Sequence, residues 1–512
     1  MEDKFITEDN SRESPILKYG KKSKHKSKSH SFLTLLTTII ILSFSILFIY
    51  LLFSSKTNNN FVIDKKSLET QFNGNSSLDK LQEIALNLPL HPYPTQQFFI
   101  NKTNTALLNA FIFIRFEKTN TNLTKIKETI IKVIKNHPVI FSKFSLNKNG
   151  DIFIKYDKNT EINIETINIK DEDIPKLGDN LLTVFKPFDS PLFKIKIYIS
   201  ETYICLFLDF FHTIMDGNSL IILYESFELA FNNKPLPKDY YFLYLKEYND
   251  NYNSEISNKT KKYYLDNYVL NKHHYPKFDE DIPDEIKKNK KPVLYSAEND
   301  SELLKQQLVK YFGERDRNYE IFMCMNVLIT NYIYSNFTDE SPEMRMGNNG
   351  RNFRKERYSV GCLITDIPIK YNFKNKKINI NNFKNEIKSQ IEMGRKLNRF
   401  PYIHIEPFGG GIRSILQRRN SFVIDKFFGK PSDNYYNYDN LLNMNTEYLF
   451  APIVMELEIS KNSANFVAIF DGKYYKKSSF ERYWNILIKS SGFLMDNMEN
   501  NNDIDIEKYF NL

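Results

Sequence analysis

Residues 203–227 constrain the fold more than any other part of the sequence. The run 203–211 is apolar and rich in aromatic and β-branched residues, which is typical of a buried strand, and it ends at His212. A turn containing Gly217 follows, and apolar residues then recur at helical spacing. Three side chains could cap that helix: Asp216, Asn218 and Ser219. The sequence therefore places His212 at a strand end, between a sheet and a helix.

His212 is the candidate catalytic residue of this stretch. An imidazole has an ordinary pKa near physiological pH, so at a strand end it can take a proton from an attacking hydroxyl, amine or thiol. His212, Asp216 and Gly217 together have the spacing H-x-x-x-D-G. This spacing resembles the HxxxDG signature of the chloramphenicol-acetyltransferase-like acyltransferase superfamily, nearest to the condensation domains of nonribosomal peptide synthetases and to alcohol acetyltransferases. The resemblance implies that His212 is the general base, and that Asp216 points away from it into a structural salt bridge.

Other segments resemble the same family in the same order, over about residues 85–500. Pro94 and Gln96 match an opening motif that precedes the first helix of condensation domains. His137 lies in a His-Pro turn that resembles the next motif, and Arg351 lies in a Gly-Arg turn that resembles a second conserved region. We interpret His137 as a structural residue at a helix end rather than as a catalyst.

Two positions depart from the condensation-domain pattern. Condensation domains usually carry an Arg where this chain has Phe141, and an Asn where it has Thr365. The missing Arg argues against peptide-bond formation on carrier-bound substrates. It also leaves Arg351 as the expected salt-bridge partner of Asp216.

The resemblance implies an α+β fold with two chloramphenicol-acetyltransferase-like lobes. Each lobe would be a mainly antiparallel sheet with helices, and a central tunnel would reach His212 from both ends. We expect the N-terminal lobe, with HxxxDG, at residues 86–280 and the C-terminal lobe at residues 281–512. The boundary falls within the charged, proline-containing segment 271–298.

The first 85 residues predict a membrane anchor. Residues 1–31 are polar with a basic run, which indicates a disordered cytosolic tail, and residues 54–85 have the composition of a stalk. Residues 32–53 contain no charged side chain and are long enough to span a bilayer as a helix. The long preceding segment and the lack of a small-residue cleavage site favour an uncleaved signal anchor over a cleaved signal peptide.

Lysines are more frequent before this span than after it, which predicts a cytosolic N-terminus. The chain would then be a single-pass type II membrane protein of the endomembrane system, with its catalytic region luminal or extracellular.

Composition excludes several other classes of function. The net charge is +8, but much of the excess lies in the N-terminal run, so we expect no nucleic-acid partner. A hydrophobic content of 41% is ample for large cores. The three cysteines lie in apolar surroundings without disulfide or metal-ligand spacing, so we expect buried thiols and no metal site: Cys205, Cys324 and Cys362.

The favoured function is transfer of an acyl group from a thioester to an alcohol or amine. We expect acyl-CoA, or another acyl thioester, as co-substrate, no permanently bound cofactor, and a monomer with small-molecule donor and acceptor. The backbone at Gly217, after Asp216, could stabilise the tetrahedral oxyanion. Residues that would bind a cofactor are not predicted.

Two alternatives stay open. One is a stand-alone condensation-type enzyme that makes amides from carrier-bound substrates. The other is a membrane-tethered binding protein that keeps the fold without turnover. An intact HxxxDG argues against the binding protein, whereas a luminal location favours it, because acyl-CoA is mainly cytosolic.

Protease protection tests the predicted topology. In sealed microsomes, we expect the membrane to shield the chain after about residue 55, because positive charge retains the N-terminal flank in the cytosol. Detergent should abolish the protection. Digestion of the C-terminal region from the cytosolic side of intact vesicles would contradict the type II assignment.

Overall fold

The computed structural model describes most of the chain from residue 78 onward. The described segments are 78–101, 109–268, 294–313, 316–351, 356–373, 376–397, 412–416, 421–427, 430–435, 453–459, 463–472 and 475–510. All of them belong to one unit, Leu78–Leu512. Within these segments no helix is long and apolar enough to cross a membrane. The expected tail 1–31, the expected span 32–53 and the lobe boundary after residue 280 lie outside them.

Helix α3 (Leu78–Leu86) occupies the end of the segment 54–85, for which the sequence predicts a stalk. Its Leu81 and Ala85 are buried. These two positions are one helical turn apart, so they form an apolar face that packs against α7 (Tyr241–Asp250). The folded region therefore begins before residue 85.

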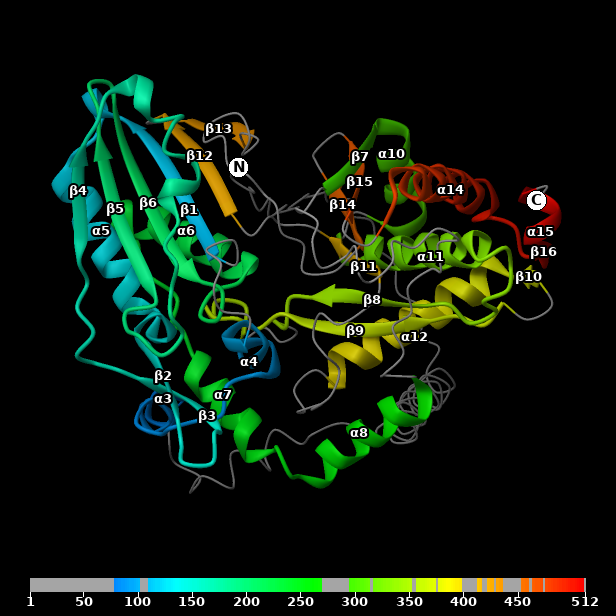
Figure 1. Ribbon diagram of the computed structural model, residues 1–512, viewed down its shortest axis with the longest axis horizontal. Helices are drawn as coiled ribbons and strands as arrows, with labels where there is room; N and C mark the ends of the chain where they lie inside the picture. The colour runs from blue at the N-terminus through cyan, green and yellow to red at the C-terminus, as the bar shows by residue number, and fades with distance from the viewer. Residues whose placement is uncertain are drawn as a thin grey trace, which may run out of the picture. The chain divides into compact units, whose positions relative to one another are not determined.

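The N-terminal sheet has six strands in the order β13-β12-β1-β6-β5-β4. The strands are β1 Asn109–Glu117, β4 Ile164–Asn168, β5 Phe193–Ile199, β6 Tyr203–Phe211, β12 Ser421–Phe427 and β13 Lys430–Tyr435. β6 lies antiparallel between β1 and β5, whereas β4 pairs with β5 and β12 with β1 in parallel. Helices α5 (Leu123–Asn136) and α6 (Gly217–Phe231) cover one face of this sheet (Figure 1).

Residues 421–435 extend the N-terminal sheet, although the sequence predicts them to belong to the C-terminal lobe. Strand β12 pairs with β1 along six residues, from Phe111 opposite Ser421 to Phe116 opposite Lys426. The pairing satisfies backbone groups of β1 that would otherwise form an open sheet edge. The boundary of the N-terminal lobe is therefore not a single position in the sequence.

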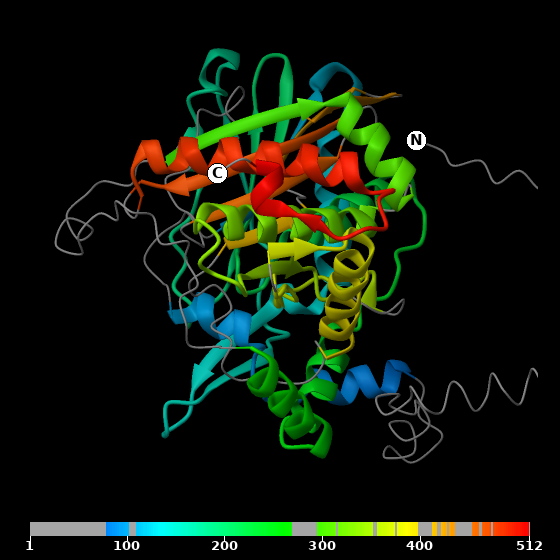
Figure 2. The same cartoon turned by 90° about the vertical axis from the view of Figure 1, so that its right-hand side faces the viewer.

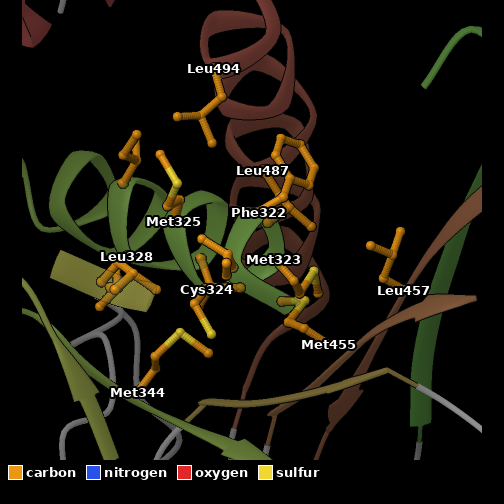
Figure 3. Packing of buried hydrophobic residues seen from close by; sticks show 14 of the residues in the cluster. Phe322, Met323, Cys324, Met325, Leu328, Met344, Met455, Leu457, Leu487 and Leu494 are labelled. Atoms are coloured by element: carbon orange, nitrogen blue, oxygen red, sulfur yellow. The ribbon is translucent and has the colours of Figure 1, made fainter. Parts of the chain in front are cut away.

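The C-terminal sheet also has six strands, in the order β7-β15-β14-β11-β8-β9. They are β7 Leu294–Ser301, β8 Glu343–Asn348, β9 Thr365–Lys370, β11 Ile412–Leu416, β14 Ile453–Ile459 and β15 Ala464–Asp471. The helices packed with this sheet are α10 Glu302–Phe312, α11 Asp316–Tyr334, α12 Ile380–Leu397 and α14 Lys477–Asn497. Figure 2 shows α14 alongside α11 across the strands. Sulfur-containing and aliphatic side chains fill the space between them, for example Met325, Met455 and Leu487 (Figure 3).

Smaller elements complete the described part of the fold. The helices are α4 Pro94–Asn101, α8 Glu255–Asn267 and α15 Ile506–Phe510. Four short 3-10 helices are η2 Lys118–Asn120, η3 Pro138–Phe141, η4 Asp171–Asp173 and η5 Gly178–Leu181. Two further sheets pair β2 Ser142–Leu146 with β3 Ile152–Tyr156 and β10 Lys377–Ile378 with β16 Ile504–Asp505.

The α+β class predicted from the sequence is confirmed by these elements. The strand expected at residues 203–211 is β6, and the helix expected after its turn is α6. The three cysteines are buried, as their apolar neighbours predict. Both six-stranded sheets are mainly antiparallel, as the resemblance implies, with parallel pairs β4–β5 and β1–β12 in the N-terminal sheet and β8–β11 and β11–β14 in the C-terminal sheet.

β6 carries a buried carboxyl group three residues before His212. Burial raises the pKa of Asp209 to about 7, although Asn109 Nδ2 and the Thr183 backbone N–H donate to the carboxylate at 2.9 and 2.7 Å and oppose the shift. Asn109 Nδ2 also donates to Thr183 O at 2.8 Å. Asp209 and Asn109 thus hold the backbone of Thr183 against the end of the sheet.

The raised pKa of Asp209 predicts a pH-dependent stability. Below the ordinary pKa of 3.8 the Asp209 carboxyl is neutral in both the folded and the unfolded protein. The free energy of unfolding then falls as the pH rises from there through the folded-state pKa of about 7. The shift corresponds to roughly 4 kcal/mol lost between about pH 4 and pH 8. We expect Asp209→Asn to remove this loss when urea unfolding is compared across that range.

Asp171→Asn is the matched control for Asp209→Asn. Hydrogen bonds from the hydroxyls of Ser200 and Thr202 lower the pKa of Asp171, so its contribution runs in the opposite direction. An Asp209→Asn variant with the same pH slope as the wild type would contradict the prediction.

Candidate active site

His212 lies directly after β6 and is fully buried. Its ring stacks on Phe99 of α4, with the ring centroids 4.2 Å apart and the planes inclined by 17°. Gln96, on the same helix, donates from Nε2 to the carbonyl oxygen of Thr213 at 2.8 Å, and its Oε1 accepts from the Tyr93 N–H at 3.0 Å. α4 therefore fixes both the plane of the imidazole and the backbone that follows it.

The turn after His212 ends in a helix cap. Met215 N–H donates to His212 O at 3.3 Å, and Asp216 then caps α6, with Oδ1 accepting from Ser219 N–H at 2.8 Å. Of the three cap candidates, Asp216 is the capping residue. Gly217 is buried as the first residue of α6. The strand end and the helix start thus determine the path of the His212 loop.

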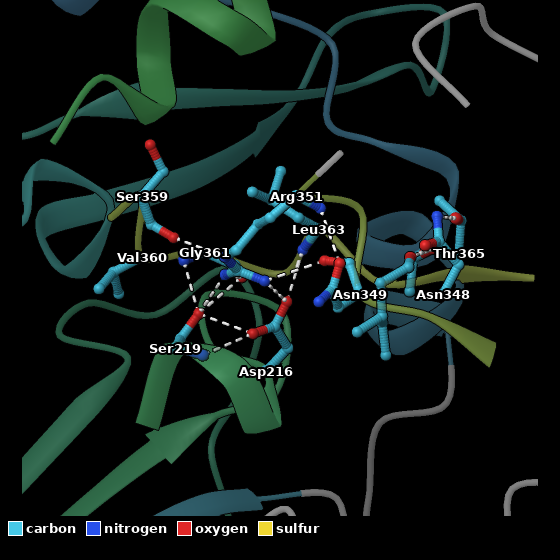
Figure 4. Close-up of polar contacts among 12 residues, drawn as sticks. Asp216, Ser219, Asn348, Asn349, Arg351, Ser359, Val360, Gly361, Leu363 and Thr365 are labelled. Carbon is cyan, nitrogen blue, oxygen red and sulfur yellow. Dashed lines mark hydrogen bonds and ion pairs between the residues drawn. The ribbon is translucent and has the colours of Figure 1, made fainter. Parts of the chain in front are cut away.

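Asp216 is also bound by the C-terminal half of the chain (Figure 4). Its Oδ2 accepts from Arg351 Nη1 at 2.9 Å and from the Leu363 backbone N–H at 2.9 Å. The two charged side chains are 0% and 4% exposed, so the ion pair is buried. No hydrogen bond joins Asp216 to the His212 ring among the described residues, and the carboxylate holds the loop instead of orienting the imidazole as a hydrolase triad does.

The guanidinium of Arg351 uses all of its donors. An arginine has five N–H groups in a planar fork. Their acceptors are Ser359 O at 2.9 Å, Asp216 Oδ2 at 2.9 Å, Asn349 O at 3.0 Å, Ser219 Oγ at 2.7 Å and Gly361 O at 3.1 Å. A lysine has a point charge and no fork, so it could not make this set of contacts.

Ser219 links the helix cap to the C-terminal half. Its Oγ accepts from Arg351 Nη2 and from the Gly361 N–H, at 2.7 and 2.9 Å. The hydroxyl lies 2.8 Å from Asp216 Oδ1, and because a carboxylate is the stronger acceptor we assign its proton to that bond. The sequence predicts Ser219 only as a possible cap, because its partner Gly361 lies 142 residues away.

Two glycines let the C-terminal segment approach these side chains. Gly350 has a φ of +70°, and a Cβ there would lie 1.8 Å from Leu363 O. A Cβ on Gly361 would lie 2.1 Å from the Tyr241 ring. Any side chain at either position would therefore displace the backbone that contacts Asp216, Ser219 and Arg351.

The surroundings of His212 on the Phe99 side are apolar. Phe99 and Cys362 form a small buried cluster, with Phe98 and Ile364 packed against it. Thr95 Oγ1, on α4, donates to Ile364 O at 2.7 Å. One helix thus joins the His212 loop to the segment that holds Asp216.

The two family departures have different surroundings. Phe141 is buried and packs edge-on against Tyr156 and Phe193, so aromatic contacts fill the place of the usual Arg. Thr365 Oγ1 accepts from Asn348 Nδ2 at 3.2 Å at the start of β9. Among the described residues, no group of three His, Cys, Asp or Glu side chains could hold a metal ion.

The buried ion pair predicts non-additive mutations. Asp216→Asn and Arg351→Gln should each cost roughly 3–5 kcal/mol of unfolding free energy, because each leaves a buried charge without its partner. The double variant should cost much less than the sum, as measured by urea unfolding in a double-mutant cycle. Lys176→Gln, which removes an exposed ion pair with Asp173, is the control and should change stability little. Additive losses would show that Asp216 and Arg351 do not act as a unit.

Comparisons with known proteins agree with this geometry. The family model of the condensation domain matches residues 92–406, whereas no curated protein sequence matches the chain. Among solved structures, the epimerization domain from the third module of tyrocidine synthetase B has a TM-score of 0.60 and 12% identity, covering 80% of this chain and 98% of that one.

Two other solved structures have a similar TM-score, sequence identity and coverage. For the starter condensation domain of rhizomide synthetase RzmA, the TM-score is 0.59 at 9% identity, with 82% and 96% of the chains covered. For the SgcC5 protein from Streptomyces globisporus, it is 0.57 at 10% identity, with 80% and 99% covered. These identities show the fold alone. Because the family model matches more than half of the sequence, the chain belongs to the condensation-domain family, within the chloramphenicol-acetyltransferase-like superfamily.

Proposed function

We propose that this protein is an acyltransferase that moves an acyl group from a thioester, acyl-CoA in the favoured case, to an alcohol or amine. The observation that carries the proposal is the placement of His212. Its imidazole is buried at the end of β6 and stacked on Phe99, in a loop fixed by Gln96 and by the Asp216–Arg351 ion pair. A side chain fixed in this way is pre-organised for proton transfer.

In the proposed reaction, His212 acts as a general base. It takes the proton of the acceptor hydroxyl or amine as the acceptor attacks the thioester carbonyl. The tetrahedral oxyanion then collapses, the C–S bond breaks, and the imidazolium returns the proton to the thiolate. Gly217 begins α6, and because the first N–H groups of a helix lack acceptors within the helix, its N–H is our candidate donor to the oxyanion.

Two solved structures support the choice of substrates. A point mutant of the RzmA starter condensation domain is described in complex with C8-CoA, an acyl thioester. SgcC5 is described in complex with (R)-(-)-1-(2-naphthyl)-1,2-ethanediol, an alcohol. Both ligands belong to the classes of donor and acceptor that we propose here.

Amide formation from carrier-bound substrates is the second candidate. The family match favours it, because condensation domains catalyse amide-bond formation. Phe141 argues against it, because its ring packs among other aromatic rings where the family usually has an Arg. A binding protein without turnover is less well supported, because HxxxDG is intact and its ion pair is formed.

The proposal includes a membrane-anchored monomer with a luminal or extracellular catalytic region. Its support is the uncharged stretch 32–53 and the lysines that precede it. A tunnel between the two lobes would bring donor and acceptor to His212 from opposite ends. A luminal site would require a supply of acyl-CoA across the membrane.

The proposed base is tested by His212→Ala. We expect turnover to fall by roughly 10²- to 10⁴-fold, the usual contribution of a positioned general base. Products of incubation with acyl-CoA donors and mixed alcohols and amines would be measured by mass spectrometry. Binding of acyl-CoA should persist, because the imidazole acts on the acceptor.

Thr213→Val is a matched control for His212→Ala. Thr213 is adjacent and buried, and its hydroxyl has no hydrogen-bond partner among the described residues, so the isosteric change should leave turnover near the wild-type rate. A folded His212→Ala variant with a near-normal rate would place the base elsewhere.

A further inference from the structure

A second buried carboxylate, outside the HxxxDG motif, also binds the segment that holds Asp216. Asp239 lies just before α7, and its Oδ2 accepts from the backbone N–H of Val360 at 3.0 Å. Its Oδ1 accepts from the N–H of Tyr241, at the start of α7, at 2.9 Å. Asp239 thus joins the helix α7 to a segment 121 residues away in the sequence.

His137 is the partner of this carboxylate. It ends α5, and its Nδ1 lies 2.7 Å from Asp239 Oδ2, with both side chains 0% exposed. The other ring nitrogen, Nε2, is buried without a hydrogen-bond partner among the described residues. The polar contact of the His137 ring is therefore directed to Asp239 alone.

Val360 belongs to the segment 359–363, which the N-terminal half binds at successive backbone groups. Val360 N–H donates to Asp239, Gly361 N–H to Ser219 and Leu363 N–H to Asp216. The carbonyl groups of Ser359 and Gly361 accept from Arg351. A shift at Val360 would therefore be transmitted to Gly361 and Leu363, and through them to the ion pair.

Val360 and Gly361 of the segment 359–363 are expected to move together, because both are fixed by the same neighbours. Tyr241, whose N–H binds Asp239, places its ring where a Cβ on Gly361 would lie, so Asp239 fixes the segment through two neighbouring contacts. Close packing leaves little room for independent movement of Val360 and Gly361.

We infer that His137 and Asp239 form a positioning pair for catalysis at His212, acting through the segment 359–363 and the Asp216–Arg351 ion pair. The inference rests on the proposed function, in which His212 is the base. Neither residue contacts the reacting atoms in this role. Their role is to fix the Val360 N–H, so that the neighbouring backbone groups of Ser359, Gly361 and Leu363 stay where Arg351, Ser219 and Asp216 bind them.

Two variants of His137 separate hydrogen bonding from packing. In His137→Asn the side-chain N–H₂ can take the place of Nδ1 as donor to Asp239, whereas His137→Leu fills the space without a donor. We expect His137→Leu to lower kcat per folded molecule by about 10- to 100-fold with little change in KM, because a small misplacement of catalytic groups is costly. His137→Asn should restore most of the rate.

Asn249→Ala is a control for damage to the helix α7. Asn249 bonds α7 to the backbone of His91 and does not contact Asp239. The Asn249→Ala variant should have a lower free energy of unfolding, whereas its kcat per folded molecule should stay near the wild-type value. If kcat of Asn249→Ala fell as much as that of His137→Leu, any damage to α7 would lower the rate, and the inference would be overturned.

A kinetic cycle with His212→Ala tests whether the pair acts through the base. In the His212→Ala background, His137→Leu should cost less than about 3-fold in kcat, because the group that it positions is already absent. An equal loss in both backgrounds, or no loss in the wild-type background, would contradict the inference.

Hydrogen exchange gives a readout that does not depend on the reaction. The amides of Val360, Gly361 and Leu363 should exchange faster in full-length His137→Leu and recover protection in His137→Asn. Unchanged protection in His137→Leu would overturn the positioning role. If protection falls as expected while His212→Ala retains normal turnover, the proposed base is wrong and the contact between His137 and the segment 359–363 is still established.

Discussion

The buried ion pair between Asp216 and Arg351 is the interaction on which the site depends. Burying two charges costs several kcal/mol each, and this cost is offset only when their hydrogen-bonding capacity is filled. Here every guanidinium N–H has an acceptor, and both carboxylate oxygens accept from backbone and side-chain donors. Because a buried ion pair is often close to neutral for net stability, we infer that its main contribution is the fixed geometry between two distant segments.

Asp216 is both the N-cap of α6 and the last residue of the turn that follows His212. Asp216 caps α6 through Ser219 N–H, and the turn before it runs back to His212. Any movement of Arg351 would thus move the start of α6 and the His212 loop together. The geometry explains why an acidic residue four positions after the His need not be a triad member, since its role is to connect segments.

Local patterns predicted much of this arrangement, whereas long-range contacts did not follow from the sequence. The apolar run before His212 and the spacing after Gly217 indicated β6 and α6, and the family resemblance indicated Arg351 as the partner of Asp216. Ser219 in the ion-pair network, Asp239 at Val360 and the pairing of β12 with β1 were missed. Each of these joins residues more than a hundred positions apart, and neither a helical nor a strand period encodes such a partner.

The charge of Asp216 also bears on how His212 can act. A carboxylate beside an imidazole stabilises the imidazolium and so retains the proton. In the proposed acyl transfer, the base would accept a proton from the acceptor and then return it to the leaving thiolate. Arg351 neutralises Asp216 and draws it into hydrogen bonds elsewhere, while Phe99, which clusters with Cys362, stacks on the imidazole without adding charge. The Asp216–Arg351 ion pair thus fixes the His212 loop without adding net charge. The Asp216 carboxylate is directed to Arg351 and not to the proton of the His212 ring.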